Sequence, residues 1–253
     1  MSVSLKDLVS YCSGLLNAQK IKDYCPNGLQ VEGASEIQKI VGGVTASQAL
    51  IDEAIARDAD VILVHHGYFW RGEAPEVTGI KRNRLKSLLT NDISLLAYHL
   101  PIDVHPKFGN NIQLAERLGF STTGPLDPDA RPSVGNVGRL DKPMTAAALT
   151  QQISERLGRK CIHIGDPSAT IESIAWCTGA AQGMIEQAVV AGVDAYLSGE
   201  ISEPTVHVAR EAGVHYFSAG HHATERYGVY ALGEHLQDVF DVAFEFVDID
   251  NPV

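Results

Sequence analysis

Apolar residues recur along the chain in two alternating patterns. Stretches in which they return every three or four residues predict helices, and short runs rich in β-branched and aromatic residues predict strands. The predicted helices cover residues 4–18, 46–57, 79–90, 111–118, 145–157, 181–191, 202–212 and 222–237. The predicted strands cover residues 40–44, 61–64, 93–98, 173–177, 195–198, 214–219 and 242–247. This alternation is typical of an α/β protein whose strands are covered by helices.

A segment with the composition of a loop lies near the middle of the chain. Residues 121–133, STTGPLDPDARPS, concentrate Pro, Gly, Ser and Asp, which favour turns. We therefore expect one α/β half over residues 1–125 and a second over residues 126–253. The C-terminal segment 220–253 is expected to pack back near the first half.

The two halves contain an internal repeat. Residues 46–66 align without a gap on residues 180–200 at an offset of 134, with six identities in 21 positions, where chance gives roughly one or two. The identical pairs are Ala46/Ala180, Gln48/Gln182, Ile51/Ile185, Ala54/Ala188, Asp60/Asp194 and Leu63/Leu197. A second match aligns residues 93–103 with residues 215–225 at an offset of 122. It superposes His99 on His221 and Asp103 on Glu225.

General likeness among α/β units is the alternative explanation of the repeat. That explanation leaves the shared His-x-x-x-acid pair unaccounted for. We therefore predict two related α/β halves with a pseudo-two-fold internal repeat.

The composition narrows the class of protein further. The chain has 253 residues, of which 45% are hydrophobic and 20% charged, and this excludes disordered, collagen-like and coiled-coil proteins. The net charge of −11 argues against non-specific binding of nucleic acid or of an anionic membrane. No apolar run approaches the ~20 residues that span a bilayer, and the N-terminus lacks the apolar stretch of a signal peptide. A cytoplasmic protein is expected.

The four cysteines do not form a recognisable chemical motif. Cys12, Cys25, Cys161 and Cys177 show no Cys-x-x-Cys spacing, so we expect reduced, packed thiols. They also lie outside the histidine-rich segments, which argues against a cysteine nucleophile.

Six of the ten histidines lie in three segments that follow predicted strands. In VILVHHGYFWRG, His65 and His66 can face one site only if the strand ends there, because adjacent strand residues point to opposite faces. Gly67 is expected to let the chain turn at that point. The carboxyl ends of strands are where open α/β sheets place their sites.

The other two segments each pair a histidine with an acid. In YHLPIDVHPKFGNN, the proline between His99 and Asp103 is expected to prevent a helix and to project both side chains from a loop. In AGHHATERYG, a helix is expected to start after Gly220, so that His221 and Glu225 lie on one helix face.

These side chains suit a divalent metal. Imidazole and carboxylate together favour Zn, Mn or Fe over Ca or Mg. The candidate ligands are His65, His66, His99, Asp103, His221 and Glu225. Six ligands suit two metals that share a bridging carboxylate. Such a pair, ~3.5–4 Å apart, holds a water that becomes a hydroxide nucleophile, which indicates hydrolysis.

The remaining histidines are interpreted as structural, because a lone histidine at a strand end is more often a satisfied polar residue than a ligand. They are His105, His163, His207, His215 and His235, with His222 left open beside His221. No nucleophile elbow, P-loop, dinucleotide or zinc-finger motif competes with the metal hypothesis.

Five segments together resemble one known family. DYCPNGLQVEG, GVTASQAL, VHHGYFWRGEAPEVTGIKRNRLK, YHLPIDVHPKFGNN and AGHHATERYG are similar to the Nif-three-like proteins, also labelled GTP cyclohydrolase 1 type 2 homologs, and to their bacterial YbgI-type members. The resemblance covers nearly the whole chain. It implies two related α/β halves, a dinuclear metal centre in the cleft between them and a toroidal homohexamer. The chain has no room for the domain that many members insert between the halves.

The resemblance also implies roles for individual residues. The metal ligands would be His65, His66, Asp103, His221 and Glu225, with Glu225 bridging. His99 is the counterpart of His221 in the repeat, whereas the resemblance gives it a less defined place at the site. We interpret it as a catalytic, site-lining residue, either a further ligand or a proton shuttle.

The family label suggests hydrolytic opening of the GTP imidazole ring, with attack at C8 and loss of formate. Lys81, Arg82 and Arg84 would meet a triphosphate if their helix start faces the cleft, and are otherwise solvated surface charges. The leading hypothesis is a hydrolase with two divalent metal ions that acts on a nucleotide or a similar small molecule.

The alternative is a non-catalytic protein that binds or delivers metal, or a ring scaffold. Glu200 or His207 acting as a general acid beside the ligands would favour the enzyme. A ring around nucleic acid is disfavoured by the acidic charge.

Overall fold

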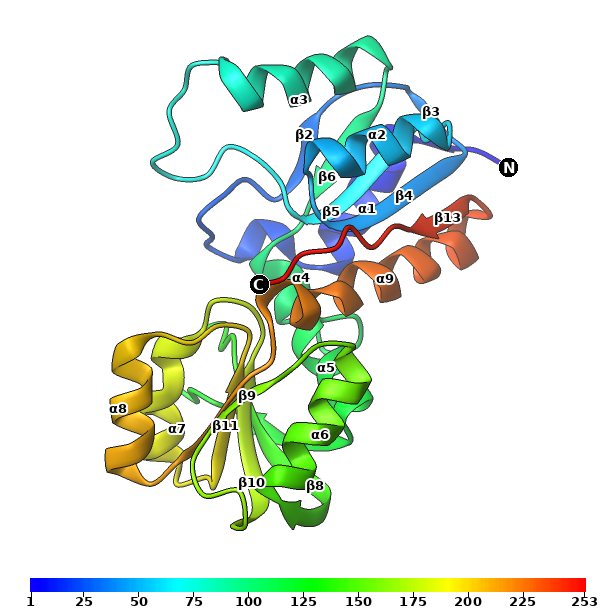
Figure 1. Cartoon of the computed structure of the whole chain (residues 1–253). Coiled ribbons are helices and arrows are strands. Elements are labelled where there is room, and N and C mark those ends of the chain that lie inside the picture. The colour runs from blue at the N-terminus through cyan, green and yellow to red at the C-terminus, as the bar shows by residue number, and fades with distance from the viewer. The chain divides into compact units, whose positions relative to one another are not determined.

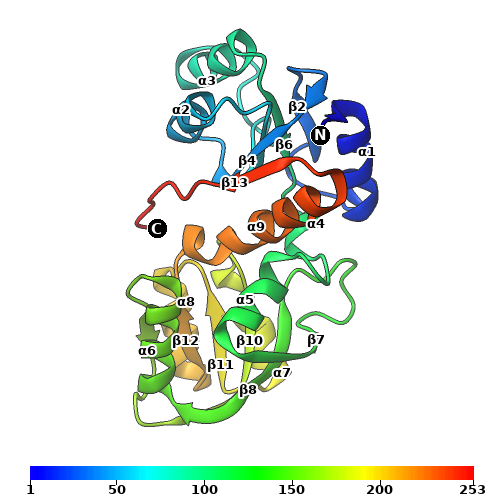
Figure 2. The same ribbon diagram turned by 90° about the vertical axis from the view of Figure 1, so that its right-hand side faces the viewer.

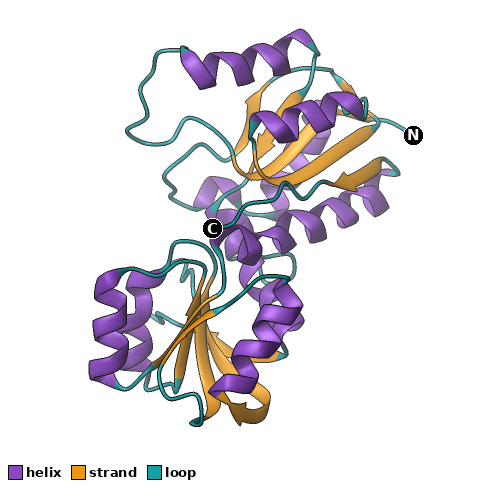
Figure 3. Cartoon of the chain, viewed as in Figure 1, coloured by secondary structure: helices purple, strands orange, loops and turns teal.

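The predicted alternation of helices and strands is found in the computed structural model, which covers residues 1–253 (Figures 1 and 3). The chain divides into two units. Unit 1 contains Met1–Phe108 and Gly228–Asp250, and unit 2 contains Gly109–Tyr227 and Asn251–Val253. Each unit is an α/β sandwich with one main sheet between helices, which confirms the predicted fold class.

The elements of unit 1 alternate as the sequence predicts, with three additional short strands. They are β1 (Val3–Ser4), α1 (Leu5–Leu15), the 3-10 turn η1 (Ala18–Lys20), β2 (Gly28–Val31), β3 (Glu36–Ile37), β4 (Lys39–Thr45), α2 (Gln48–Ala56), β5 (Val61–His66), α3 (Gly79–Thr90), β6 (Ser94–Ala97), α4 (Leu100–Asp103) and β13 (Ala243–Phe246). The helix α9 (His221–Phe240) begins in unit 2, and its residues from Gly228 onward belong to unit 1.

The main sheet of unit 1 has the strand order β13-β4-β5-β6-β2, and only the edge strand β2 is antiparallel to its neighbour. The helices α1 and α9 cover one face, and α2 and α3 cover the other (Figure 2). Alternate residues of a strand therefore enter different cores: Val61 packs with α1 and α9, and Ile62 packs with α2. Burial on both faces explains why these strands are continuous apolar runs.

Unit 2 has the same arrangement of helices around a sheet, with six strands in place of five. Its elements are α5 (Asn110–Leu118), β7 (Phe120–Pro125), β8 (Asn136–Thr145), α6 (Ala146–Leu157), β9 (Ile162–Ile164), β10 (Thr170–Cys177), the 3-10 turn η2 (Gln182–Met184), α7 (Ile185–Ala191), β11 (Ala195–Ser198), α8 (Glu203–Ala212) and β12 (His215–Ser218). The strand order is β7-β8-β10-β11-β12-β9, in which β10, β11 and β12 are mutually parallel.

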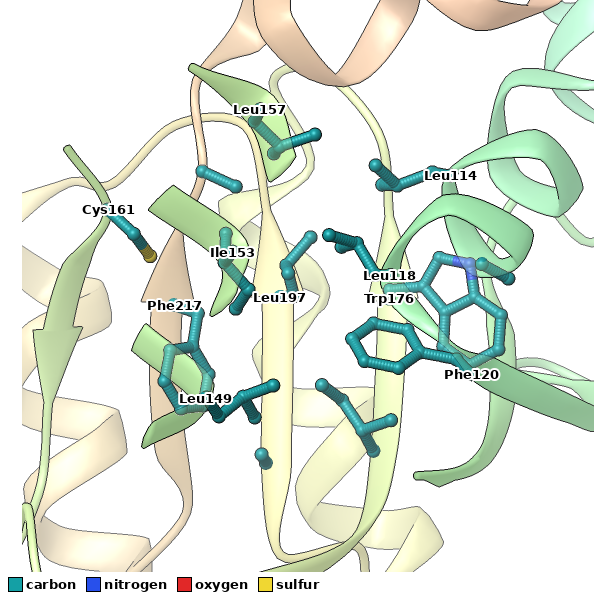
Figure 4. Close-up of a cluster of buried hydrophobic side chains, with 14 of the residues drawn as sticks. Leu114, Leu118, Phe120, Leu149, Ile153, Leu157, Cys161, Trp176, Leu197 and Phe217 are labelled. Carbon is teal, nitrogen blue, oxygen red and sulfur yellow. The ribbon is translucent and has the colours of Figure 1, made fainter. Parts of the chain in front are cut away.

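The core of unit 2 between the sheet and the helices α5 and α6 contains Trp176 beside Phe120 (Figure 4). The Trp176 ring is fully buried, lies 5.5 Å from the Phe120 ring between centroids, and donates Nε1–H to the Asn111 carbonyl at 2.9 Å. That bond satisfies the one polar group of a large apolar side chain. The helices α7 and α8 cover the opposite face of the sheet.

The internal repeat corresponds to the same strand–helix–strand–helix–strand path in both units. Ile40 of β4 pairs with Val61 of β5, and Ile174 of β10 pairs with Ala195 of β11. Both partners are displaced by the predicted offset of 134.

The shared aspartates explain part of the sequence identity. Asp60 Oδ2 accepts the N–H groups of Gln38 and Lys39 at 2.7 and 2.9 Å. Asp194 Oδ2 accepts those of Glu172 and Ser173 at 3.0 and 2.8 Å, the equivalent positions. Each carboxylate therefore ties the start of one central strand to the start of the next.

The chain enters unit 2 earlier than the loop composition suggests. Residues of the segment 121–133 form most of β7, which pairs antiparallel with β8, and Phe120 is buried in the core of unit 2. The switch between units lies at Phe108–Gly109 instead. The C-terminal residues 228–250 belong to unit 1, where Val229 and Leu232 pack in its core.

No helix, including the 20-residue α9, has the length and hydropathy needed to cross a membrane. All four cysteines are buried and form no disulfide. Burial raises the pKa of Cys12 and Cys161 to about 12, so these thiols stay protonated at neutral pH.

We expect Asp194→Ala to destabilise the protein by about 2–3 kcal/mol, because it removes a charged acceptor of two backbone N–H groups and the Ser173 hydroxyl. Burial opposes the charged form, but these hydrogen bonds outweigh it and lower the pKa of Asp194. The loss of unfolding free energy relative to wild type should therefore reach its full size above the ordinary carboxyl pKa. It should disappear as the pH falls through the lower pKa of the folded state. Urea unfolding across this pH range measures the difference in unfolding free energy, and Asp238→Ala at an exposed aspartate is the control. A loss of stability independent of pH would contradict the assignment.

Candidate metal-binding clusters

The predicted site residues of unit 1 lie at the carboxyl ends of two neighbouring parallel strands. His65 and His66 end β5, His99 follows β6, and Asp103 ends the short helix α4. We call these four residues the unit 1 cluster. The ligand nitrogens of the three histidines all lie within 4.8 Å of one another, close enough to hold a metal ion.

His65 and Asp103 form the buried part of this cluster. The His65 ring is fully buried, and its Nδ1 lies 3.2 Å from the Tyr98 carbonyl oxygen. A carbonyl only accepts, so in the neutral ring Nδ1 carries the proton and Nε2 carries a lone pair. This Nε2 lies 3.7 Å from Asp103 Oδ1. Without a proton or a metal ion at Nε2, this lone pair and the carboxylate would repel each other, so the pair fits a bound metal.

His66 lies beside His65, with ring centroids 4.4 Å apart, and its Nδ1 lies 3.1 Å from the Thr45 hydroxyl. The strand ends at His66 as expected, but Gly67 does not take a positive φ. Gly67 is needed for space instead: a Cβ there would lie 2.2 Å from Gln30 Oε1 and 2.6 Å from the Ala97 Cβ. The close approach of these groups allows β5 to end directly at the two histidines.

The proline of the second histidine segment also acts differently from expectation. Pro101 does not prevent a helix but occupies the first turn of α4, where its missing N–H is not required. The Asp103 N–H donates to the His99 carbonyl at 3.2 Å. His99 and Asp103 are therefore held by one helical turn rather than by a loop.

Two residues that the sequence analysis did not single out hold His99. Asp23 Oδ1 lies 2.8 Å from His99 Nδ1, and Asn27 Oδ1 accepts the His99 backbone N–H at 2.7 Å. Burial opposes the charge of Asp23, but its hydrogen bonds with His99 and Asn27 outweigh this and lower its pKa to about 2. Both residues lie in the segment DYCPNGLQVEG, so the family resemblance was the available signal for them.

The predicted site residues of unit 2 lie at the start of α9. Gly220 takes a φ of +101°, and His221 begins the helix directly after it. His221 Nε2 then lies 3.0 Å from Glu225 Oε2, as the four-residue spacing predicts. Glu200, which follows β11, places Oε1 2.7 Å from His221 Nδ1. We call these three residues the unit 2 cluster.

The electrostatics of the unit 2 cluster favour a cation. Burial disfavours the charged imidazole, but the hydrogen bonds and charges of Glu225 and Glu200 outweigh it and raise the pKa of His221 to about 9. A proton thus occupies the space that a metal ion would take. A carboxylate on the second ring nitrogen of a ligating histidine is a frequent arrangement in metal sites.

A glycine lies directly against two residues of the unit 2 cluster. Gly179 follows β10 and has a φ of +69°. A Cβ at this position would lie 2.0 Å from Glu225 Oε1 and 3.2 Å from His221 Nε2. The absence of a side chain at residue 179 therefore makes room for both predicted ligands.

The remaining candidates lie outside the two clusters. His207 pairs with Glu203 on the exposed surface of α8, at 2.8 Å. His235 Nε2 lies 2.7 Å from the Tyr11 hydroxyl, and His163 Nε2 lies 3.0 Å from His215 Nδ1. The His105 Nδ1 accepts two backbone N–H groups, and the His222 backbone N–H donates to Val253 at 3.0 Å. Among the basic residues of α3, Lys81 forms an ion pair with Glu73, with Nζ 3.0 Å from Oε1.

Comparison with known proteins identifies relatives across the whole chain. The family model described as Duf34/NIF3 (NGG1p interacting factor 3) matches residues 3–252. A Pseudomonas aeruginosa protein named GTP cyclohydrolase 1 type 2 homolog is 56% identical over 252 residues, which cover 100% of both chains.

Solved structures share the fold. A structure described as protein ybgI, of unknown function, has a TM-score of 0.96 and 49% identity, and the match covers 99% of this chain and 100% of that one. TTHA1606 from Thermus thermophilus has a TM-score of 0.89 and 29% identity, with 99% of this chain and 100% of that chain covered.

We expect Gly179→Ala to weaken metal binding by about 10- to 100-fold, because its Cβ displaces Glu225 and crowds His221. The positive φ should also cost about 1–2 kcal/mol of stability. Gly192→Ala is the matched control, since Gly192 has a φ of +68° but open space around it. Titration with metal ions and thermal unfolding separate the two effects. Equal metal affinity in both variants would show that Gly179 has no role at the ligands.

Proposed function

Because this chain belongs to the Duf34/NIF3 family, we propose that its two clusters together bind two divalent metal ions and that it is a metal-dependent hydrolase. The observation that carries the proposal is the placement of imidazoles and carboxylates at the carboxyl ends of equivalent strands in both units. Sites of open α/β sheets lie at these ends.

The proposed ligands are His65, His66 and Asp103 from unit 1 with His221 and Glu225 from unit 2. Nitrogen and oxygen donors of this kind suit Zn, Mn or Fe. The opposed acceptors of His65 and Asp103, and the two carboxylates around His221, support the proposal because each leaves negative potential that a cation neutralises. Glu225 is the proposed bridging ligand.

When bound, such ions would polarise the substrate and lower the pKa of a water at the site. The chain itself orients the ligands. The Tyr98 carbonyl, the Thr45 hydroxyl and Glu200 each engage the Nδ1 of one histidine. With Nδ1 engaged in this way, Nε2 would be the donor atom to a metal, and the planes of the rings are fixed.

The proposed substrate is a nucleotide or a similar small molecule, with GTP suggested by the names of relatives. The aromatic Trp70 ring stands edge-on to His99, 4.9 Å between centroids, and is suited to contact a planar base. A phosphate reaching Lys81 would have to compete with Glu73. Assembly as a homohexamer and a cytoplasmic location remain predictions of the resemblance.

We expect wild-type protein purified without chelator to hold about two divalent ions per chain. Glu225→Gln should lose most of this metal while keeping the fold, because a bridging carboxylate would bind both ions. Glu203→Gln is the matched control, since Glu203 forms the same i,i+4 pair with a histidine on an exposed surface. Elemental analysis and circular dichroism measure both properties.

Asp103→Asn tests whether the clusters share their ions. If they do, this change in unit 1 should lower the metal content beyond the loss of one ion. Loss of one ion from Asp103→Asn and of the other from Glu225→Gln would instead indicate independent sites. A wild-type protein that takes up no metal on reconstitution would reject the proposal.

We expect metal-loaded protein to hydrolyse a compound in a panel of nucleotides, phosphoesters and small cyclic amides, measured by release of formate or phosphate. Chelation or Glu225→Gln should abolish the activity. Metal binding without activity on any compound would favour the alternative of a metal-binding or delivery protein. Activity that survives removal of all metal would contradict the proposed mechanism.

A further inference from the structure

The segment between η1 and β2 forms a clamp around His99. Asp23 Oδ1 faces His99 Nδ1 at 2.8 Å and also accepts the Tyr24 N–H at 2.6 Å, whereas Oδ2 accepts the Leu100 N–H at 2.9 Å. Asn27 donates from Nδ2 to Asp23 Oδ2 at 2.9 Å and accepts the His99 N–H at 2.7 Å. Ring and backbone of His99 are thus fixed together by a segment about 70 residues earlier in the chain.

The clamp leaves only one orientation for the ring. The side chain of Asp23 is 2% exposed and that of His99 is 14% exposed, so water does not compete strongly for their hydrogen bond. The His99 ring lies 4.9 Å from the His65 ring and 5.7 Å from the His66 ring between centroids. The Trp70 ring makes a T-shaped contact with the His99 ring and donates its own Nε1–H to the Gly67 carbonyl at 3.1 Å.

The repeat contains a second example of the same pairing. His221 is the counterpart of His99 at the offset of 122, and its Nδ1 also faces a carboxylate, that of Glu200, at 2.7 Å. The two carboxylates come from different places: Glu200 follows β11, whereas Asp23 precedes β2. Two unrelated segments therefore supply a carboxylate to the same nitrogen of equivalent histidines.

A metal bound directly by the clamp is a poor explanation of it. Asp23, Cys25 and His99 have ligand atoms within 4.8 Å of one another. Burial, helped by the charge of Asp23, raises the pKa of Cys25 to about 12, so the thiolate that a metal requires is costly. Both carboxylate oxygens of Asp23 are also engaged by hydrogen-bond donors.

We propose that Asp23 is a positioning residue that holds neutral His99 with its proton on Nδ1, so that the Nε2 lone pair serves as proton acceptor beside the His65–His66 pair. An acceptor on Nδ1 fixes this tautomer because a carboxylate cannot donate. The use of Nε2 in hydrolysis rests on the proposed function. The tautomer and its dependence on Asp23 do not.

Asp23→Asn gives a specific spectroscopic test. Asparagine has one acceptor oxygen. The Leu100 N–H and Asn27 Nδ2 donors lie on the Oδ2 side, and the Tyr24 N–H donates on the Oδ1 side at 2.6 Å. The amide should turn its oxygen toward the side with two donors and its NH2 toward His99 Nδ1. The His99 proton should then move to Nε2.

Imidazole 15N–1H correlation spectra of metal-free protein, recorded above the titration range of histidine, distinguish the two tautomers. His99→Gln identifies the His99 signals by their loss. We expect a protonated Nδ1 in wild type and a protonated Nε2 in Asp23→Asn. Neutron diffraction from crystals locates the same proton directly if the assembly is too large for solution spectra.

Asp60→Asn is the control for a purely structural effect. Asp60 is another aspartate of unit 1 that accepts backbone N–H groups, without an imidazole partner. This variant should leave the His99 tautomer unchanged. A wild-type His99 with its proton on Nε2, or an unchanged tautomer in Asp23→Asn, would overturn the proposal. An equal change in Asp60→Asn would also overturn it.

Metal and activity measurements separate this proposal from the proposed function. Asp23→Asn should retain the wild-type metal content, because Asp23 and His99 are not among the proposed ligands. With a substrate from the panel, its kcat should fall by about 10²- to 10⁴-fold, the usual contribution of an acid–base group, with little change in KM. Full activity in Asp23→Asn would reject the proton-acceptor role. A wild-type protein without metal would reject the proposed function while leaving the tautomer result intact.

Discussion

The parallel register of the central strands determines where the functional side chains emerge. In unit 1, β4, β5 and β6 are aligned so that their carboxyl ends lie at one edge of the sheet, and β10, β11 and β12 do the same in unit 2. Asp60 and Asp194 hold the opposite ends of these strands together. A slip of one residue would turn every side chain to the other face, so the register of these parallel strands sets the positions of His65 and Glu200.

At the carboxyl ends, the second constraint is the fixed orientation of the imidazoles. Each of the four histidines has its Nδ1 near an oxygen: the Tyr98 carbonyl, the Thr45 hydroxyl, or the carboxylates of Asp23 and Glu200. Thr45 lies at the end of β4, and Tyr98, Asp23 and Glu200 lie in loops. The sites therefore combine rigid strand ends with hydrogen bonds that select one nitrogen of each ring, which is the preorganisation that metal binding requires.

Much of this arrangement could be predicted from the sequence. The period of the apolar residues identified the central strands, the offset of 134 identified their duplication, and the four-residue spacing of His221 and Glu225 predicted their contact. These features are local, or they are repeated, and either property makes them visible in one sequence.

The parts that could not be predicted depend on contacts between distant segments. Asp23 meets His99 across 76 residues, and no periodicity connects the two. Pro101 was misjudged because proline is excluded from the interior of a helix but not from its first turn. The strand β8 has an exposed, polar second half, so its alternation gave little signal. Gly67 and Gly179 are needed for space beside other side chains, a requirement that appears only once those side chains are placed.

The duplicated strands differ in what they carry at their ends. The offset of 134 places His65 opposite Gly199 and His66 opposite Glu200, so one copy bears two imidazoles where the other bears a glycine and a carboxylate. The two subunits of a symmetric homodimer must carry the same residue at each position. Two related units within one chain are free of that restriction, because each has its own sequence. The single chain can therefore carry unequal donor sets at equivalent strand ends.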